Sequence, residues 1–134
     1  MSFIGDLLET PPRLTTASRY TALNGVIYLI AGAAVVVWPG VAQTLFREAA
    51  FVGHEGAFMR VIGLTVVVIG WLYVFGGRSG ARQIVAASVV DRLVFVPLVL
   101  LPIACAGVFP RMLVAFALLD VSLAIGAWWL MHRK

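Results

Sequence analysis

The residue with the clearest chemical potential is an aspartate, Asp120, inside the apolar run "FALLDVSLAIGAWWLMHRK". If this run forms a membrane helix, Asp120 lies about ten residues from either end, about 15 Å from each surface. A carboxylate facing hydrocarbon there is costly, so we expect it to be paired, protonated or directed into an internal cavity. The small residues Ala117, Ala124 and Ala127 share its helical face, which indicates that this face packs against another helix.

Three other charged residues lie close to apolar segments and could join Asp120. Arg92 is near the start of the third apolar segment, and Arg60 is one turn into the second from the opposite side. We favour Arg92 as the partner, because the third and fourth segments are joined by a short connection. Asp91 lies about 100° around the helix from Arg92 and is expected to face elsewhere. Alternatively, Ser88 and Asp91 in "SVVDR" have the spacing of a helix cap, which would make Asp91 and Arg92 head-group-level topology residues.

Several roles for Asp120 remain open from the sequence. A buried ion pair or hydrogen-bonded acid would fix the register of the helices. A functional acid would instead couple to a proton or cation, or recognise the polar group of a lipophilic ligand such as a lipid or quinone.

Few other side chains could support catalysis or metal binding. Cys105 is the single cysteine, which excludes an intramolecular disulfide and a thiolate metal cluster. His54 and His132 are expected on opposite sides of the membrane and therefore cannot share a metal ion. The sequence contains no nucleophile–base pair and no phosphate-binding loop. We therefore expect no enzymatic activity and no intrinsic cofactor.

The composition identifies the environment of the chain. Of 134 residues, 62% are hydrophobic and 12% are charged, with a mean hydropathy of +1.02. A soluble domain has roughly a quarter of its residues charged, so this chain is expected to be solvated mainly by lipid. Its ten basic residues are scattered between apolar runs. This distribution argues against nucleic acid as a partner and favours contacts with lipid head groups.

Four apolar segments predict the architecture. They cover residues 20–38, 56–77, 84–106 and 110–131, and each is close to the ~20 residues that span a bilayer. Backbone polar groups must be paired in lipid, so we expect helices and a single all-α domain, an integral membrane four-helix bundle over residues 1–134. The first twenty residues lack a basic signal-peptide region, so the first segment is expected to be retained.

Basic residues predict the orientation of these segments. One side of the membrane receives seven of them and the other receives three. The larger set is Arg13, Arg19, Arg78, Arg82, Arg92, Arg133 and Lys134, and the smaller set is Arg47, Arg60 and Arg111. The positive-inside rule then predicts both termini in the cytoplasm, in a bacterial inner membrane. The connection "VAQTLFREAAFVGHE" fits a short amphipathic interfacial segment and a plain loop equally well.

Small residues and prolines predict how the helices pack. Glycines recur every seven residues, so each set lies along one side of its helix. The first set contains Gly25 and Gly32, and the second contains Gly56, Gly63, Gly70 and Gly77. Such stripes allow close approach of two helix backbones. In the third segment, Pro97 and Pro102 should bend the helix by removing the donors to Leu93 and Leu98.

Aromatic residues cluster near the predicted helix ends. These are Trp38, Trp71, Tyr73, Trp128 and Trp129. Their positions are typical of the aromatic belts at membrane–water interfaces.

The sequence resembles the DoxX-like superfamily of small four-helix bacterial membrane proteins over about residues 23–131. The resemblance rests on "LNGVIYLIAG" followed by "PG", on "RVIGLTVVVIGWLYVFGGR", on "DRLVFVP" and on an acid in the fourth helix. It implies the four-helix fold, and the superfamily includes a subunit associated with quinone-linked sulfur oxidation. It transfers no catalytic residue to this chain.

The sequence therefore supports two hypotheses on function. The first is a non-catalytic accessory subunit that packs within a larger membrane complex beside other subunits. The alternative is a binding or transport module for a proton, an ion or a lipophilic molecule, centred on Asp120 and Arg92. Either role is compatible with a homo-oligomer.

Overall fold

The computed structural model describes residues 3–133, and this part of the chain is helical without any strand. Its elements in order are α1 (Phe3–Leu8), α2 (Thr16–Val37), α3 (Gly40–Phe46), α4 (Glu55–Arg78), α5 (Arg82–Val90), η1 (Asp91–Phe95), α6 (Val96–Cys105) and α7 (Pro110–His132). Four helices are long and apolar enough to span a membrane, the third being the continuous run of α5, η1 and α6. The predicted all-α class is confirmed for these residues, together with four helices that are long and apolar enough to span a membrane.

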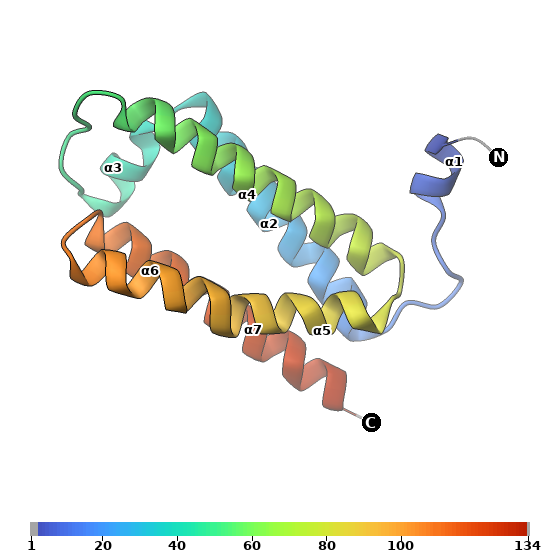
Figure 1. Ribbon diagram of the computed structural model, residues 1–134. Coiled ribbons are helices and arrows are strands. Elements are labelled where there is room, and N and C mark those ends of the chain that lie inside the picture. Colours follow the sequence, from blue (N-terminus) through green and yellow to red (C-terminus); the bar gives the residue numbers. More distant parts are fainter. Residues whose placement is uncertain (1–2, 134) are drawn as a thin grey trace.

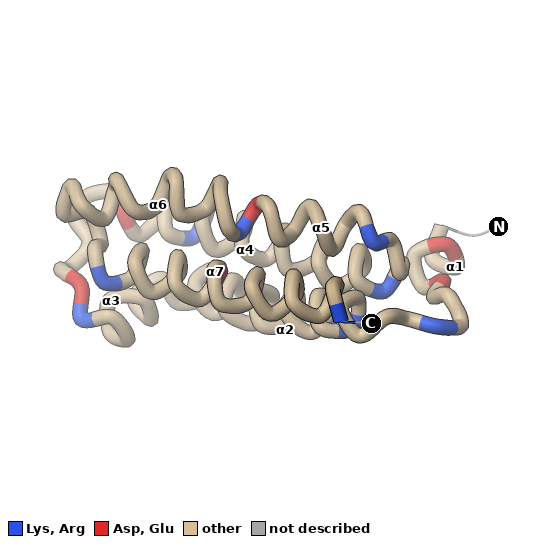
Figure 2. The backbone as a smooth tube through the Cα atoms, turned by 90° about the horizontal axis from the view of Figure 1, so that it is seen from below, with Lys and Arg blue, Asp and Glu red and all other residues tan. Residues whose placement is uncertain are grey.

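The bundle consists of two helical hairpins that diverge from one end to the other. One hairpin is α2 with α4, and the other is α6 with α7 (Figure 1). The hairpins approach each other where α5 packs against α2 and α7, and they separate toward α3. Most charged positions lie at the two ends of the bundle, as Figure 2 shows.

The α2–α4 hairpin is held together by backbone contact at glycines. A Cβ atom on Gly25 would lie 2.6 Å from the carbonyl oxygen of Gly70, and one on Gly32 would lie 2.7 Å from that of Gly63. Gly77 continues this series against the start of α2. In lipid, where no hydrophobic force joins helices, such close backbone approach is a main source of packing energy.

The third span contains a π-turn beside its first proline. The backbone N–H of Val96 donates to the carbonyl of Asp91, a five-residue spacing that is wider than the α-helical one. Pro97, which has no N–H, is the next residue and the second of α6. The wider turn makes room for the proline ring without ending the helix. The distortion predicted from Pro97 therefore takes the form of η1.

The segment after α2 closes the wide end of the bundle. α3 forms within the predicted connection, and its buried Ala42 packs with Met59 and Met112. The carboxylate of Glu48 accepts a hydrogen bond of 2.8 Å from the backbone N–H of Met112, in the first turn of α7. This acts as a helix cap supplied from another segment. The connection is thus an ordered part of the bundle.

The glycine contact predicts a sharp difference between two positions on α4. Gly70→Ala should destabilise the protein by about 1–3 kcal/mol, because its Cβ would lie 2.6 Å from the backbone nitrogen of Leu29. Gly56→Ala is the matched control, since its Cβ would meet only Phe51 at 3.6 Å. It should be neutral or stabilising, because alanine favours a helix by ~1 kcal/mol over glycine. Unfolding in mild detergent measures both, and equal effects would contradict a backbone contact at Gly70.

Candidate functional site

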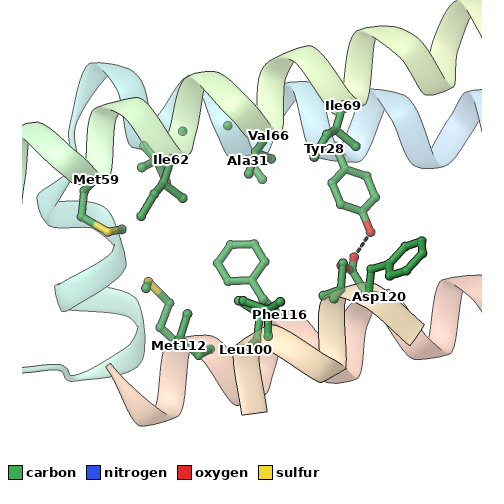
Figure 3. A pocket seen from close by; sticks show the side chains of 17 residues that line it. Tyr28, Ala31, Met59, Ile62, Val66, Ile69, Leu100, Met112, Phe116 and Asp120 are labelled. Carbon is green, nitrogen blue, oxygen red and sulfur yellow. Dashed lines mark hydrogen bonds between the residues drawn. The ribbon is translucent and has the colours of Figure 1, made fainter. Parts of the chain in front are cut away.

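A cavity of about 400 Å³ lies between the two diverging hairpins. Residues of α2, α4, η1, α6 and α7 line it, and nearly all of them are apolar. Met59 and Met112 lie toward its wide end, Phe116 projects into its middle, and Tyr28 and Asp120 lie at its narrow end (Figure 3). Among the described residues, Tyr28 and Asp120 are the two that line the cavity with a polar side chain. The cavity is therefore an apolar space that ends on a carboxyl and a phenol.

Asp120 is buried and hydrogen-bonded to a tyrosine. It is 6% exposed, and its Oδ1 accepts a hydrogen bond from the hydroxyl of Tyr28 (Figure 3). Ala117, Ala124 and Ala127 on the same helix are also buried, so this face of α7 is directed into the bundle. The expected pairing of Asp120 with Arg92 is wrong, because Tyr28 occupies the partner position.

Arg92 is satisfied by a separate set of partners. It is 1% exposed, and it donates from Nε to the carbonyl of Ser88 at 2.9 Å and from Nη2 to the hydroxyl of Ser88 at 3.1 Å. With its amide oriented to satisfy both neighbours, Asn24 accepts from Nη1 of Arg92 at 3.1 Å and donates to the carbonyl of Tyr20 at 3.3 Å. The guanidinium also lies 5.0 Å from the ring centroid of Tyr73, a cation–π distance.

Two tyrosines connect these groups into one polar layer. The hydroxyl of Tyr73 donates to Oδ2 of Asp91 at 2.9 Å. Its ring meets that of Tyr28 edge-on, with centroids 5.5 Å apart. The layer therefore runs from Asp120 through both tyrosine rings to Asp91 and Arg92.

The surroundings of these residues correct two sequence-based expectations. Ser88 does not cap a helix, because it lies within α5 and its hydroxyl donates to the carbonyl of Val85 at 2.8 Å. Asp91 and Arg92 are consequently the tenth and eleventh residues of the third candidate span, Arg82–Cys105, and do not begin it. Tyr73 is 7% exposed and belongs to the polar layer, not to an interfacial aromatic belt.

Arg60 takes no part in this layer. It is exposed on α4 and donates from Nε to the carbonyl of Val36 at 3.2 Å. Of the four predicted site residues, Asp120 alone lines the cavity. Asp91 and Arg92 contact Tyr73 instead.

The polar side chains of α2 were not predicted as part of the site. Buried polar residues recur at three- and four-residue spacing along this helix, namely Ser18, Thr21, Asn24 and Tyr28. That spacing, within an otherwise apolar segment, is the signal that could have revealed them. Thr21 is fully buried, and its hydroxyl has no hydrogen-bond partner within the described residues.

The arrangement limits the chemistry that this site can perform. Across residues 3–133, no three His, Cys, Asp or Glu side chains come together in a group that could hold a metal ion. The cavity offers a carboxyl oxygen, a phenol and a large apolar wall. Such a combination orients a lipophilic molecule through one polar group.

The chain matches no protein-family model, no curated protein and no solved structure. The resemblance to the DoxX-like superfamily therefore stays a prediction from the sequence.

The contacts of Arg92 predict that its planar guanidinium stabilises the folded protein more than a lysine ammonium would. Arg92→Lys should destabilise the protein by about 2 kcal/mol, because an ammonium cannot bond Ser88 and Asn24 together while contacting Tyr73. Arg60→Lys is the control, since Arg60 is exposed and makes one backbone hydrogen bond. Thermal unfolding in mild detergent compares them, and similar losses would contradict a special role for Arg92.

Proposed function

We propose that this chain is a membrane-embedded binding module for a lipophilic molecule. The apolar body of the ligand occupies the cavity between the hairpins, and its polar group reaches Asp120 and Tyr28. The observation that carries this proposal is a cavity of about 400 Å³ whose apolar wall ends on a buried carboxyl–phenol pair. Its volume lies within the range of small-molecule sites, about 300–1,000 Å³.

The lateral surface of the bundle supports access to this cavity from the bilayer. Ile62, Phe95 and Val99 line the cavity, and each is also more than half exposed. These residues belong to α4, η1 and α6. A lipophilic ligand dissolved in the membrane would therefore enter between the two hairpins without crossing water.

An accessory role in a larger complex is the second candidate function. It is favoured by α1, a short helix with no buried residue that lies apart from the bundle (Figure 1). Phe3, Ile4 and Leu8 on this helix are all more than half exposed. A neighbouring membrane subunit would cover this apolar surface, and such a subunit could receive the ligand bound in the cavity.

For the orientation, we propose cytoplasmic termini in a bacterial inner membrane, on the basis of the seven-to-three distribution of basic residues. The first residues of α2 and the last residues of α7 lie at the same end of the bundle, where Arg82 donates to the carbonyl of Met131 at 3.5 Å. The α3 end would then face the periplasm.

A bulky residue in the cavity tests the binding function. Ala31→Phe, in the α2 wall of the cavity, should leave folding intact and lower the amount of lipophilic compound that stays bound to the purified protein by ~10-fold. Ala33→Phe is the control, because Ala33 lies on the exposed side of the same helix. Mass spectrometry of compounds extracted from each variant measures the difference.

The outcomes of this experiment separate the two candidate functions. Equal retention by both variants, or no bound compound in any of them, would contradict the binding function. A larger assembly with other polypeptides and no bound compound would instead favour the accessory role. Extraction with mild detergent from the native membrane keeps both outcomes observable.

The single cysteine tests the orientation. Cys105, the exposed last residue of α6, should react with a membrane-impermeant maleimide from the periplasmic side. A Cys105→Ser chain that carries Ser79→Cys, in the loop between α4 and α5, is the matched control. It should react only after the inner membrane is permeabilised, and the opposite pattern would show that the orientation is inverted.

A further inference from the structure

The wall of the cavity carries one acidic side chain and no basic one among the residues that the structure describes. Asp120 supplies that charge, and its neighbour Tyr28 supplies a phenol. Arg92 does not line the cavity, because its guanidinium lies on the far side of the two tyrosine rings, against Tyr73. The electrostatics of the cavity are therefore set by a carboxyl group that lacks a cationic partner.

The hydrogen bonds at this end restrict the polar groups that a ligand can present. The hydroxyl proton of Tyr28 is already donated to Oδ1 of Asp120. Within residues 3–133, no group donates a hydrogen bond to Oδ2 of Asp120. When Asp120 is ionised, it offers no donor to a ligand that only accepts hydrogen bonds, and it repels an anionic ligand. When it is protonated, its O–H can donate to an acceptor, but that bond lacks the charge attraction that a cation gains. A cationic group supplies the missing counter-charge, and the low dielectric strengthens this attraction.

The apolar wall near the carboxyl group also suits a cation. Tyr28, Phe95 and Phe116 line the cavity, and Met59 and Met112 line its wide end, away from Asp120. Aromatic faces attract ammonium groups, most strongly where water is excluded. Thioethers are polarizable and adapt to irregular apolar ligands.

We propose that the ligand is a lipophilic cation, an amine or quaternary ammonium on an apolar body, which binds Asp120 in exchange for a proton. This inference rests on the proposed binding function and specifies its ligand. One proton leaves the carboxyl group as one cation arrives, so the net charge of the cavity is unchanged. The exchange avoids leaving a bare carboxylate in the membrane, which would be costly.

The groups around Asp120 determine how this exchange responds to pH. Tyr28 is the titratable group that faces Asp120 from α2, with Tyr73 of α4 behind it. Arg92 and Asp91 of η1 lie beyond Tyr73, and α6 contributes only apolar side chains to the cavity wall. Protons compete with the cation for one carboxyl group, so cation affinity should rise as the pH rises.

Three ligands with the same alkyl chain test the proposal, namely decyltrimethylammonium, decanol and decanoate. Their binding to the full-length protein in nanodiscs is measured by equilibrium dialysis at two pH values, with protein-free nanodiscs as the background. We expect decyltrimethylammonium to bind at least ~10-fold more tightly than decanol or decanoate, and its binding to weaken as the pH is lowered.

Two variants assign the effect to Asp120. Asp120→Asn keeps an oxygen for the Tyr28 hydroxyl and should reduce cation affinity by ~10-fold or more while removing the pH dependence. Asp91→Asn is the control, because it removes an intramembrane carboxylate that does not line the cavity. If Asp120→Asn fails to fold, the comparison of three head groups on the native chain still decides the question.

The results distinguish failure of this inference from failure of the binding function. Tight, pH-independent binding of decanol or decanoate that Ala31→Phe abolishes would overturn the cation proposal and keep the binding function. Loss of cation binding in Asp91→Asn as large as in Asp120→Asn would also overturn it. If none of the three ligands binds above the background, the cation proposal fails, and the compounds extracted from the purified chain then decide the binding function.

Discussion

The backbone contact between α2 and α4 is the constraint on which the rest of the structure depends. Because Gly25 meets Gly70 without intervening side chains, the backbones of α2 and α4 lie close together at this point. Tyr28 of α2 and Tyr73 of α4 lie beside this contact, and their rings meet edge-on. Each tyrosine then presents its hydroxyl to an acid on the other hairpin, Asp120 or Asp91. The glycine contact thus positions the phenol donors that satisfy the buried carboxyl group of Asp120 and the half-buried one of Asp91.

The membrane imposes a second condition, because each buried charge needs a polar partner within the bundle. Asp91 and Arg92 are adjacent and point about 100° apart around their helix. This geometry lets Asp91 reach Tyr73 of α4 while Arg92 reaches Asn24 of α2. Since η1 widens the helix at this level, the two residues of the third span can serve both helices of the first hairpin.

The sequence predicted the spans and the glycine stripes well, because both depend on local composition and helical periodicity. It failed for the partner of Asp120, which depends on the direction of a long side chain. Side chains on a helix lean toward its N-terminus. Arg92 therefore runs back to Ser88, one turn earlier, and away from the level of Asp120. Chain connectivity placed the two helices side by side but could not reveal that direction, nor the donor from α2.

The shape of the cavity follows from a gradient of residue size along α7. At the narrow end, Ala124 and Ala127 are fully buried and allow the neighbouring helices to approach closely. Toward the wide end, the larger residues Phe116 and Met112 take the place of these alanines, and α3 packs across the opening between the hairpins. Asp120 lies between these two regions, at the point where the helices begin to separate. Its position makes it part of the buried polar layer and of the cavity wall at once, so the acid that helps to hold the bundle together is also the group that the proposed ligand would reach.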